Sequence, residues 1–102
     1  MSESKVQSKI LKWLKANKFW VFKTILCNRN GIPDIVGCTP KGRFFAIEVK
    51  YGANKPSKLQ EWNIAEIQKV GGIAFVAWDL ETVQTTLAPE VGGTGPVPSN
   101  DV

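Results

Sequence analysis

The segment 35–50 contains the pattern that most constrains the fold of this chain. Two apolar runs, 35–39 and 43–50, flank the tripeptide Pro40-Lys41-Gly42, and the second run alternates strongly between apolar and polar residues. Proline fixes φ near about −65°, and a glycine two positions later can adopt the left-handed conformation that a three-residue loop requires. The sequence therefore predicts a β-hairpin with a short turn.

The register of this hairpin brings three ionisable side chains together. A three-residue loop pairs Thr39 with Arg43, and continuing the pairing places Asp34 opposite Glu48. Because alternate side chains of a strand point to the same face, Glu48 and Lys50 share a face, and Asp34 shares it with them. We expect two carboxylates and an ammonium group to converge there.

The facing carboxylates predict a bound divalent cation. Like charges on opposed strands repel by up to about 1 kcal/mol unless a cation lies between them. Oxygen ligands without a nearby histidine or thiolate favour Mg²⁺ or Mn²⁺, which keep several waters and accept phosphate oxygens. Lys50 would then orient or deprotonate a water, or stabilise charge on a phosphate. The alternative interpretation is an ordinary Glu/Lys ion pair on a solvated strand face.

The composition limits both the architecture and the chemistry. At 102 residues the chain is expected to form one domain, residues 1–88, followed by a disordered Pro/Gly-rich tail, residues 89–102. It has no histidine, which excludes Ser-His-Asp and Cys-His catalysis, and it lacks the glycine-rich loops that bind nucleotide cofactors. No apolar run approaches ~18 residues, so we expect an intracellular protein without a membrane span or signal peptide.

Charge is distributed unevenly along the chain. Residues 1–58 carry twelve Lys/Arg against three acids, whereas residues 59–102 carry one base against six acids. A carboxylate cluster within a cationic surface suits a polyanion, because lysines attract phosphates while carboxylates hold a metal, and nucleic acid is the natural candidate. The residues expected to contact it are Lys5, Lys9, Lys12, Arg29, Lys55, Ser57 and Lys58. Each lysine taken alone also fits a solvated helix face.

The remaining patterns complete a mixed α+β arrangement in the order αβββαβ with a short C-terminal helix. Two long helices are expected at 3–17 and 57–70, and the short helix at 80–87. Two further strands are expected at 19–26 and 72–78. We expect the aromatic residues of the 19–26 strand to lie in the core, and the 72–78 strand to be covered on both faces.

Two polar helix residues each fit a structural and a functional role. Glu3 lies in the first helical turn, where an acid complements the helix dipole, or it contacts a metal through water. Gln60 fits a capping box with Ser57. It also heads a stripe, continued by Ile64 and Ile67, that faces the sheet near Lys50, where it could contact a phosphate or the attacking water.

Four motifs, taken in order, resemble the PD-(D/E)xK nuclease superfamily. They are Gly31-Ile32-Pro33-Asp34, Phe45-Ala46-Ile47-Glu48-Val49-Lys50, Ser57-Lys58-Leu59-Gln60 and Gly71-Gly72. Within the superfamily, residues 3–78 are similar to a stand-alone virus-type replication-repair nuclease (VRR-NUC) domain, a relative of archaeal Holliday junction resolvases. The resemblance implies a restriction-endonuclease-like fold and a Mg²⁺- or Mn²⁺-dependent DNA endonuclease acting on branched DNA such as Holliday junctions.

The resemblance also implies roles for individual residues. Asp34, Glu48 and the backbone carbonyl of Val49 would bind the metal, with Glu3 contacting it through water, Lys50 as the catalytic lysine and Gln60 as the active-site glutamine. Relatives of this kind are often homodimers, which fits the need for two symmetric cuts at a four-way junction, and the regions of Trp20 and Trp78 are the expected contacts. A non-catalytic nucleic-acid-binding module on the same fold, or an accessory subunit, is the alternative.

Overall fold

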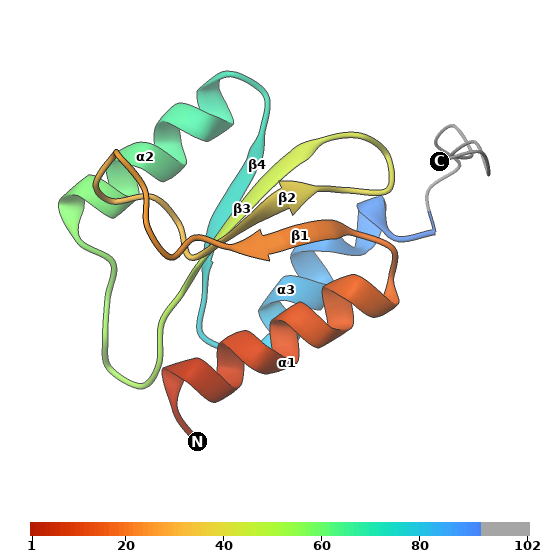
Figure 1. Ribbon diagram of the computed structural model, residues 1–102, viewed down its shortest axis with the longest axis horizontal. Helices are drawn as coiled ribbons and strands as arrows, with labels where there is room; N and C mark the ends of the chain where they lie inside the picture. The colour runs from red at the N-terminus through yellow and green to blue at the C-terminus, as the bar shows by residue number, and fades with distance from the viewer. Residues whose placement is uncertain (93–102) are drawn as a thin grey trace.

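A computed structural model describes residues 1–92 and shows a mixed sheet with helices on both faces (Figure 1). The elements, in chain order, are α1 (Glu3–Ala16), β1 (Trp20–Lys23), β2 (Ile35–Cys38), β3 (Phe44–Val49), α2 (Lys58–Lys69), β4 (Ile73–Ala77), α3 (Leu80–Leu87) and the 3₁₀ helix η1 (Ala88–Glu90). This order confirms the predicted αβββαβ core and short C-terminal helix. None of the helices within residues 1–92 has the length and apolar content needed to span a bilayer.

The hairpin of β2 and β3 has the predicted register. Ile35 lies opposite Ile47, and the backbone N–H of Thr39 donates to the carbonyl oxygen of Arg43 at 2.8 Å. Gly42 adopts φ = 84°, the left-handed conformation that a side chain disfavours. Continuing the register by one residue beyond β2 places Asp34 beside Glu48, at the end of the hairpin away from its turn.

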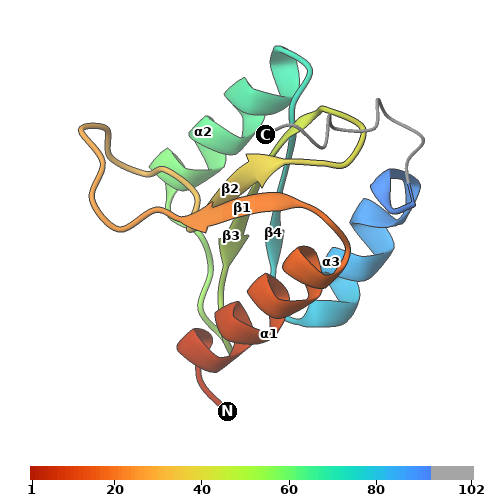
Figure 2. The same cartoon turned by 45° about the vertical axis from the view of Figure 1, so that its right-hand side comes forward.

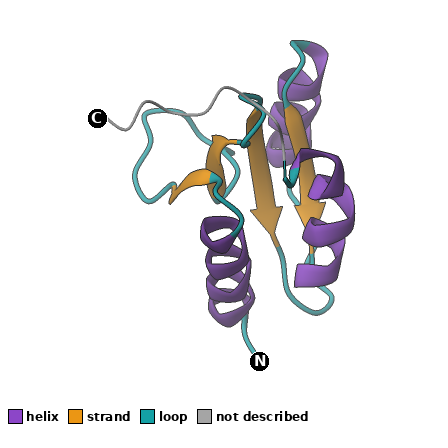
Figure 3. Ribbon diagram, turned by 90° about the vertical axis from the view of Figure 1, so that its right-hand side faces the viewer, coloured by secondary structure: helices purple, strands orange, loops and turns teal. Residues whose placement is uncertain are grey.

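The sheet has strand order β1-β2-β3-β4, antiparallel except for the β3–β4 pair, and α2 makes the crossover between those parallel strands. α1 and α3 cover one face and α2 covers the other (Figures 2 and 3). Alternate residues of β3 face the two layers, so Phe45, Ile47 and Val49 pack with α1 and α3, whereas Ala46 packs with α2. Each fully buried large apolar side chain contributes about 1.5–3 kcal/mol to folding.

The prediction for the first strand was partly wrong. β1 ends at Lys23, and Ile25 and Leu26 lie in the loop that follows it. Phe19 is buried, but Trp20 and Phe22 are exposed. β1 is an edge strand, and α2 packs against β4 at the opposite side of the sheet, so the β1 side chains that point away from α1 have no covering layer.

Regular structure continues past residue 88, where the disordered tail was expected to begin. Residues 88–90 form η1, and the Glu90 side chain is buried, where its Oε1 accepts a hydrogen bond from the Thr39 hydroxyl at 2.7 Å. The Lys41 ammonium donates to the Pro89 carbonyl, and Val91 packs against the core. These contacts hold the chain through residue 92 even though its composition resembles that of a disordered segment. The rest of the predicted tail, residues 93–102, lies outside the described residues.

We expect Glu90→Ala to destabilise the protein by about 1–3 kcal/mol, because it leaves the buried Thr39 hydroxyl without its acceptor. Glu90→Gln keeps an acceptor oxygen and should cost less than Glu90→Ala. Urea unfolding followed by circular dichroism measures both variants. Equal stability of wild type and Glu90→Ala would show that η1 is not held to the hairpin turn.

Candidate active site

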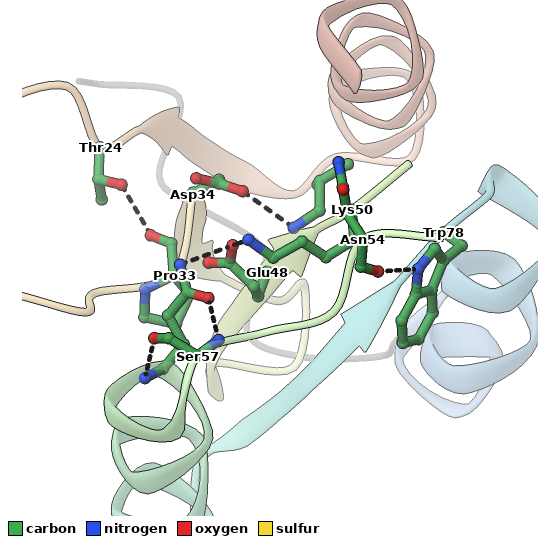
Figure 4. Close-up of polar contacts among 10 residues, drawn as sticks. Thr24, Pro33, Asp34, Glu48, Lys50, Asn54, Ser57 and Trp78 are labelled. Atoms are coloured by element: carbon green, nitrogen blue, oxygen red, sulfur yellow. Dashed lines mark hydrogen bonds and ion pairs between the residues drawn. The ribbon is translucent and has the colours of Figure 1, made fainter. Parts of the chain in front are cut away.

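Asp34, Glu48 and Lys50 converge where the open end of the β2–β3 hairpin meets the start of α2 (Figure 4). Asp34 Oδ2 accepts a hydrogen bond from the Val49 backbone N–H at 3.0 Å, which fixes this carboxylate against β3. The Lys50 ammonium lies 3.1 Å from Glu48 Oε2. The predicted convergence of two carboxylates and one ammonium group is therefore present in the structure.

Gln60 connects the cap of α2 to Glu48. Its Oε1 accepts from the Ser57 backbone N–H at 2.8 Å, and the Ser57 hydroxyl accepts from the Gln60 backbone N–H at 3.1 Å, which completes the capping box. The Gln60 Nε2 donates to Glu48 Oε2 at 3.1 Å. One amide thus serves the helix terminus and the site together, and the two roles considered for Gln60 are compatible. A contact from Gln60 to phosphate or water remains a prediction.

The electrostatics of Glu48 are unusual for a carboxylate. Its side chain is buried, with 1% of the residue surface exposed. Burial, followed by the negative charge of nearby Asp34, raises the pKa of Glu48 to about 7, although Lys50 acts in the opposite direction. Glu48 Oε1 is buried and has no hydrogen-bond partner. An unpaired buried acceptor of this kind costs about 1–3 kcal/mol.

A hard divalent cation fits this donor set. Such a cation would offset the repulsion between the carboxylates of Asp34 and Glu48, and it would be coordinated by the unpartnered Oε1 of Glu48. Within residues 1–92, no three acidic, cysteine or histidine side chains lie close enough together to hold a metal ion as a group. Two carboxylates, with a backbone carbonyl such as that of Val49, match Mg²⁺ or Mn²⁺, which bind proteins through few side chains and keep several waters.

Glu3 does not join Asp34 and Glu48 as a third acid of a common group in the described part of the chain. It lies in the first turn of α1, the position that complements the helix dipole, and its side chain is partly exposed. The expected contact through water stays a prediction.

The cationic residues assigned to nucleic-acid contact are accessible to solvent. All seven residues of this set are exposed: Lys5, Lys9 and Lys12 on α1, Arg29 in the β1–β2 loop, and Lys55, Ser57 and Lys58 at or just before the start of α2. Arg29 also lies over the ring of Trp62, 5.7 Å from its centroid, in a cation–π contact. Contacts from these residues to phosphate stay a prediction.

Asn63 supports the site and was not identified from the sequence. It is buried, and its Nδ2 donates to the carbonyl oxygens of Asn30 and Gly31, both at 3.1 Å, which ties the segment before Asp34 to α2. A signal was available: Asn63 lies three residues after Gln60 and next to Ile64, so it interrupts the inward face of an amphipathic helix with a polar side chain.

The fold and the site define a small α+β domain whose central hairpin carries a carboxylate pair and a lysine beside a helix glutamine. Solved structures with the same architecture include a chain named "VRR_NUC domain", with a TM-score of 0.74, 24% identity, and coverage of 86% of this chain and 97% of that chain. A second, named "VRR_NUC domain protein", has a TM-score of 0.72, 20% identity, and coverage of 88% of both chains. No protein-family model and no curated protein matches the sequence. The chain therefore has the fold of VRR-NUC domains, which the motifs predicted.

We expect the metal-free protein to lose stability as the pH rises from 5 to 8. The pKa of Glu48 is raised from 4.5 to about 7 in the folded state, so folding favours the protonated form. The contribution of this proton to the free energy of unfolding is fully present below about pH 4.5 and is lost as the pH rises through about 7. It amounts to at most about 3 kcal/mol. Thermal unfolding in EDTA measures the effect.

Glu48→Gln is the matched control for this titration, since it keeps the size and the acceptor for Gln60 but does not ionise. Its stability should vary less with pH than that of wild type over the same interval. Parallel pH profiles for the two proteins would contradict a raised pKa at Glu48.

Proposed function

We propose that this chain is a VRR-NUC-type, divalent-metal-dependent DNA endonuclease that hydrolyses phosphodiester bonds. The observation that carries the proposal is the buried Glu48 carboxylate, which has an unpartnered Oε1, a second carboxylate beside it and Lys50 at 3.1 Å. A structural ion pair alone needs neither the second acid nor the unpaired oxygen. The fold shared with VRR-NUC domains supports the same conclusion.

Asp34 and Glu48 would hold Mg²⁺ or Mn²⁺, together with the Val49 carbonyl. The cation supplies Lewis acidity toward a phosphate oxygen and lowers the pKa of a coordinated water. The Val49 N–H fixes Asp34, and Gln60 fixes Oε2 of Glu48, so both carboxylates are oriented before substrate binds. Lys50 shares the site, where its ammonium can orient the attacking water or stabilise charge on the phosphate.

The proposed substrate is branched DNA, cut by in-line attack of water to leave a 5′-phosphate and a 3′-hydroxyl. The net charge of residues 1–58, with twelve Lys/Arg against three acids, favours a polyanion bound across the hairpin and α1. A homodimer would place two such sites on one four-way junction, which requires two symmetric cuts. The motif resemblance supports both points, and a panel of labelled DNA structures together with light scattering tests them.

We expect Asp34→Asn and Lys50→Ala each to reduce cleavage of junction DNA by about 10²–10³-fold or more while largely sparing binding, because they remove charge from the reacting centre. Gel assays with Mn²⁺ measure cleavage, and mobility shifts measure binding. Lys69→Ala is the matched control, since Lys69 is an exposed lysine at the far end of α2 that pairs with Glu66. Full activity of Asp34→Asn or Lys50→Ala would refute the assignment.

We expect Mn²⁺ to stabilise the wild-type protein by about 2.7 kcal/mol at a free concentration of 100 times its dissociation constant. The double variant Asp34→Asn/Glu48→Gln should show no such shift, because both proposed ligand charges are removed. Calorimetry and thermal unfolding measure the two proteins. Metal binding without cleavage of any DNA would favour the non-catalytic binding module, whereas no metal binding would remove the basis of the proposal.

A further inference from the structure

The loop between β1 and β2, residues 24–34, is fixed at both ends. Thr24 donates from its backbone N–H to the Asp34 carbonyl at 2.8 Å and from its hydroxyl to the Pro33 carbonyl at 2.7 Å. Asn63 of α2 holds the carbonyls of Asn30 and Gly31. The loop projects beyond the end of the sheet beside the first turns of α2 (Figures 1 and 2). Its base is therefore anchored to the proposed metal ligand and to the helix.

Ile25 and Leu26, the two residues that follow Thr24, form an exposed apolar pair. Ile25 is 90% exposed and Leu26 is 93% exposed, the most exposed large apolar residues in the described part of the chain. Single exposed apolar residues are common, whereas contiguous exposed apolar surface marks interaction sites. The exposure is not needed for folding, because the anchoring contacts come from Thr24 and Asn63.

The apolar pair lies beside the proposed active site. A hollow of about 260 Å³ is bounded by residues of the 24–32 segment, including Ile25, Leu26 and Arg29, and by Asp34. Exposed Lys23 and Arg29 lie on either side of the pair in the sequence. A phosphate held at Asp34 would place the attached bases near the pair, and the flanking cations favour nucleic acid over a protein partner.

We propose that Ile25 and Leu26 form an apolar wedge that contacts the faces of bases next to the scissile phosphate and stabilises an unstacked base step there. Apolar side chains inserted between base steps act in this way in proteins that kink DNA. Unstacking is easiest where bases are already unpaired, so the wedge would favour branches, bulges and mispaired steps over continuous duplex. The location of the phosphate rests on the proposed function.

The double variant Ile25→Ser/Leu26→Ser tests the wedge. The probe is a four-way junction with 2-aminopurine beside the branch point, bound with Ca²⁺, which takes the same oxygen ligands as Mg²⁺. Wild type should raise 2-aminopurine fluorescence by about threefold as the base unstacks, and the double variant should not. With Mn²⁺, the double variant should cut the junction about tenfold more slowly but cut a single strand of the same sequence within about twofold of wild type, since a single strand has no paired step to open.

Two matched variants control for loss of apolar surface and for loop shape. Val70→Ser removes an apolar side chain that is 85% exposed at the far end of α2, and it should behave as wild type. The exchange Ile25→Leu/Leu26→Ile keeps the apolar character and should also retain both signals. Because the three positions that are changed, Ile25, Leu26 and Val70, are exposed, circular dichroism should confirm that each variant is folded.

Unchanged fluorescence and unchanged junction cleavage in the serine double variant would overturn the wedge. A lower molecular mass of that variant in light scattering would overturn it as well, because the apolar pair would then be a contact between two copies of the chain. If wild type cuts no DNA, the proposed function fails, but the fluorescence measurement still decides whether the apolar pair separates bases.

Discussion

The register of the β2–β3 hairpin is the constraint on which the rest of the structure depends. Side chains alternate between the two faces of a sheet, so a slip of one residue would move Glu48 and Lys50 into the α1 layer and turn Phe45 and Ile47 toward α2. The turn prevents the slip for two reasons. Gly42 adopts the left-handed conformation within the turn, and the backbone N–H of Thr39 before the turn donates to the carbonyl of Arg43 after it. A turn of three residues thereby determines where Asp34, Glu48 and Lys50 lie at the opposite end of the strands.

The site concentrates unfavourable electrostatics in a layer that is otherwise apolar. Glu48 lies on the same face as Val36, Ala46 and Ala74, which pack against Ile64 of α2. Its burial is tolerated because Lys50 and Gln60 each contact Oε2, but Oε1 receives no partner. The protein is therefore less stable than its packing alone would allow, which is typical of functional sites.

The parts of the fold that depend on local pattern could be predicted from the sequence. The hairpin, the capping box of α2 and the facing of Asp34 and Glu48 follow from turn chemistry and side-chain alternation. The exposure of Trp20 and Phe22 could not be predicted, because it depends on which helix covers which strand, and their apolar character suggests a core. The ordering of residues 89–92 was missed for a similar reason: the partner of Glu90 is Thr39, 51 positions earlier in the chain.

The pairing of Glu90 with Thr39 also determines where the last described residues lie. It attaches η1 to the turn of the hairpin, whereas Asp34, Glu48 and Lys50 lie at the other end of the same strands. Within residues 1–92, the C-terminal segment is therefore separated from the carboxylate pair by the full length of the hairpin. Substitutions that loosen η1 would disturb the turn first and the carboxylates only through the strands between them.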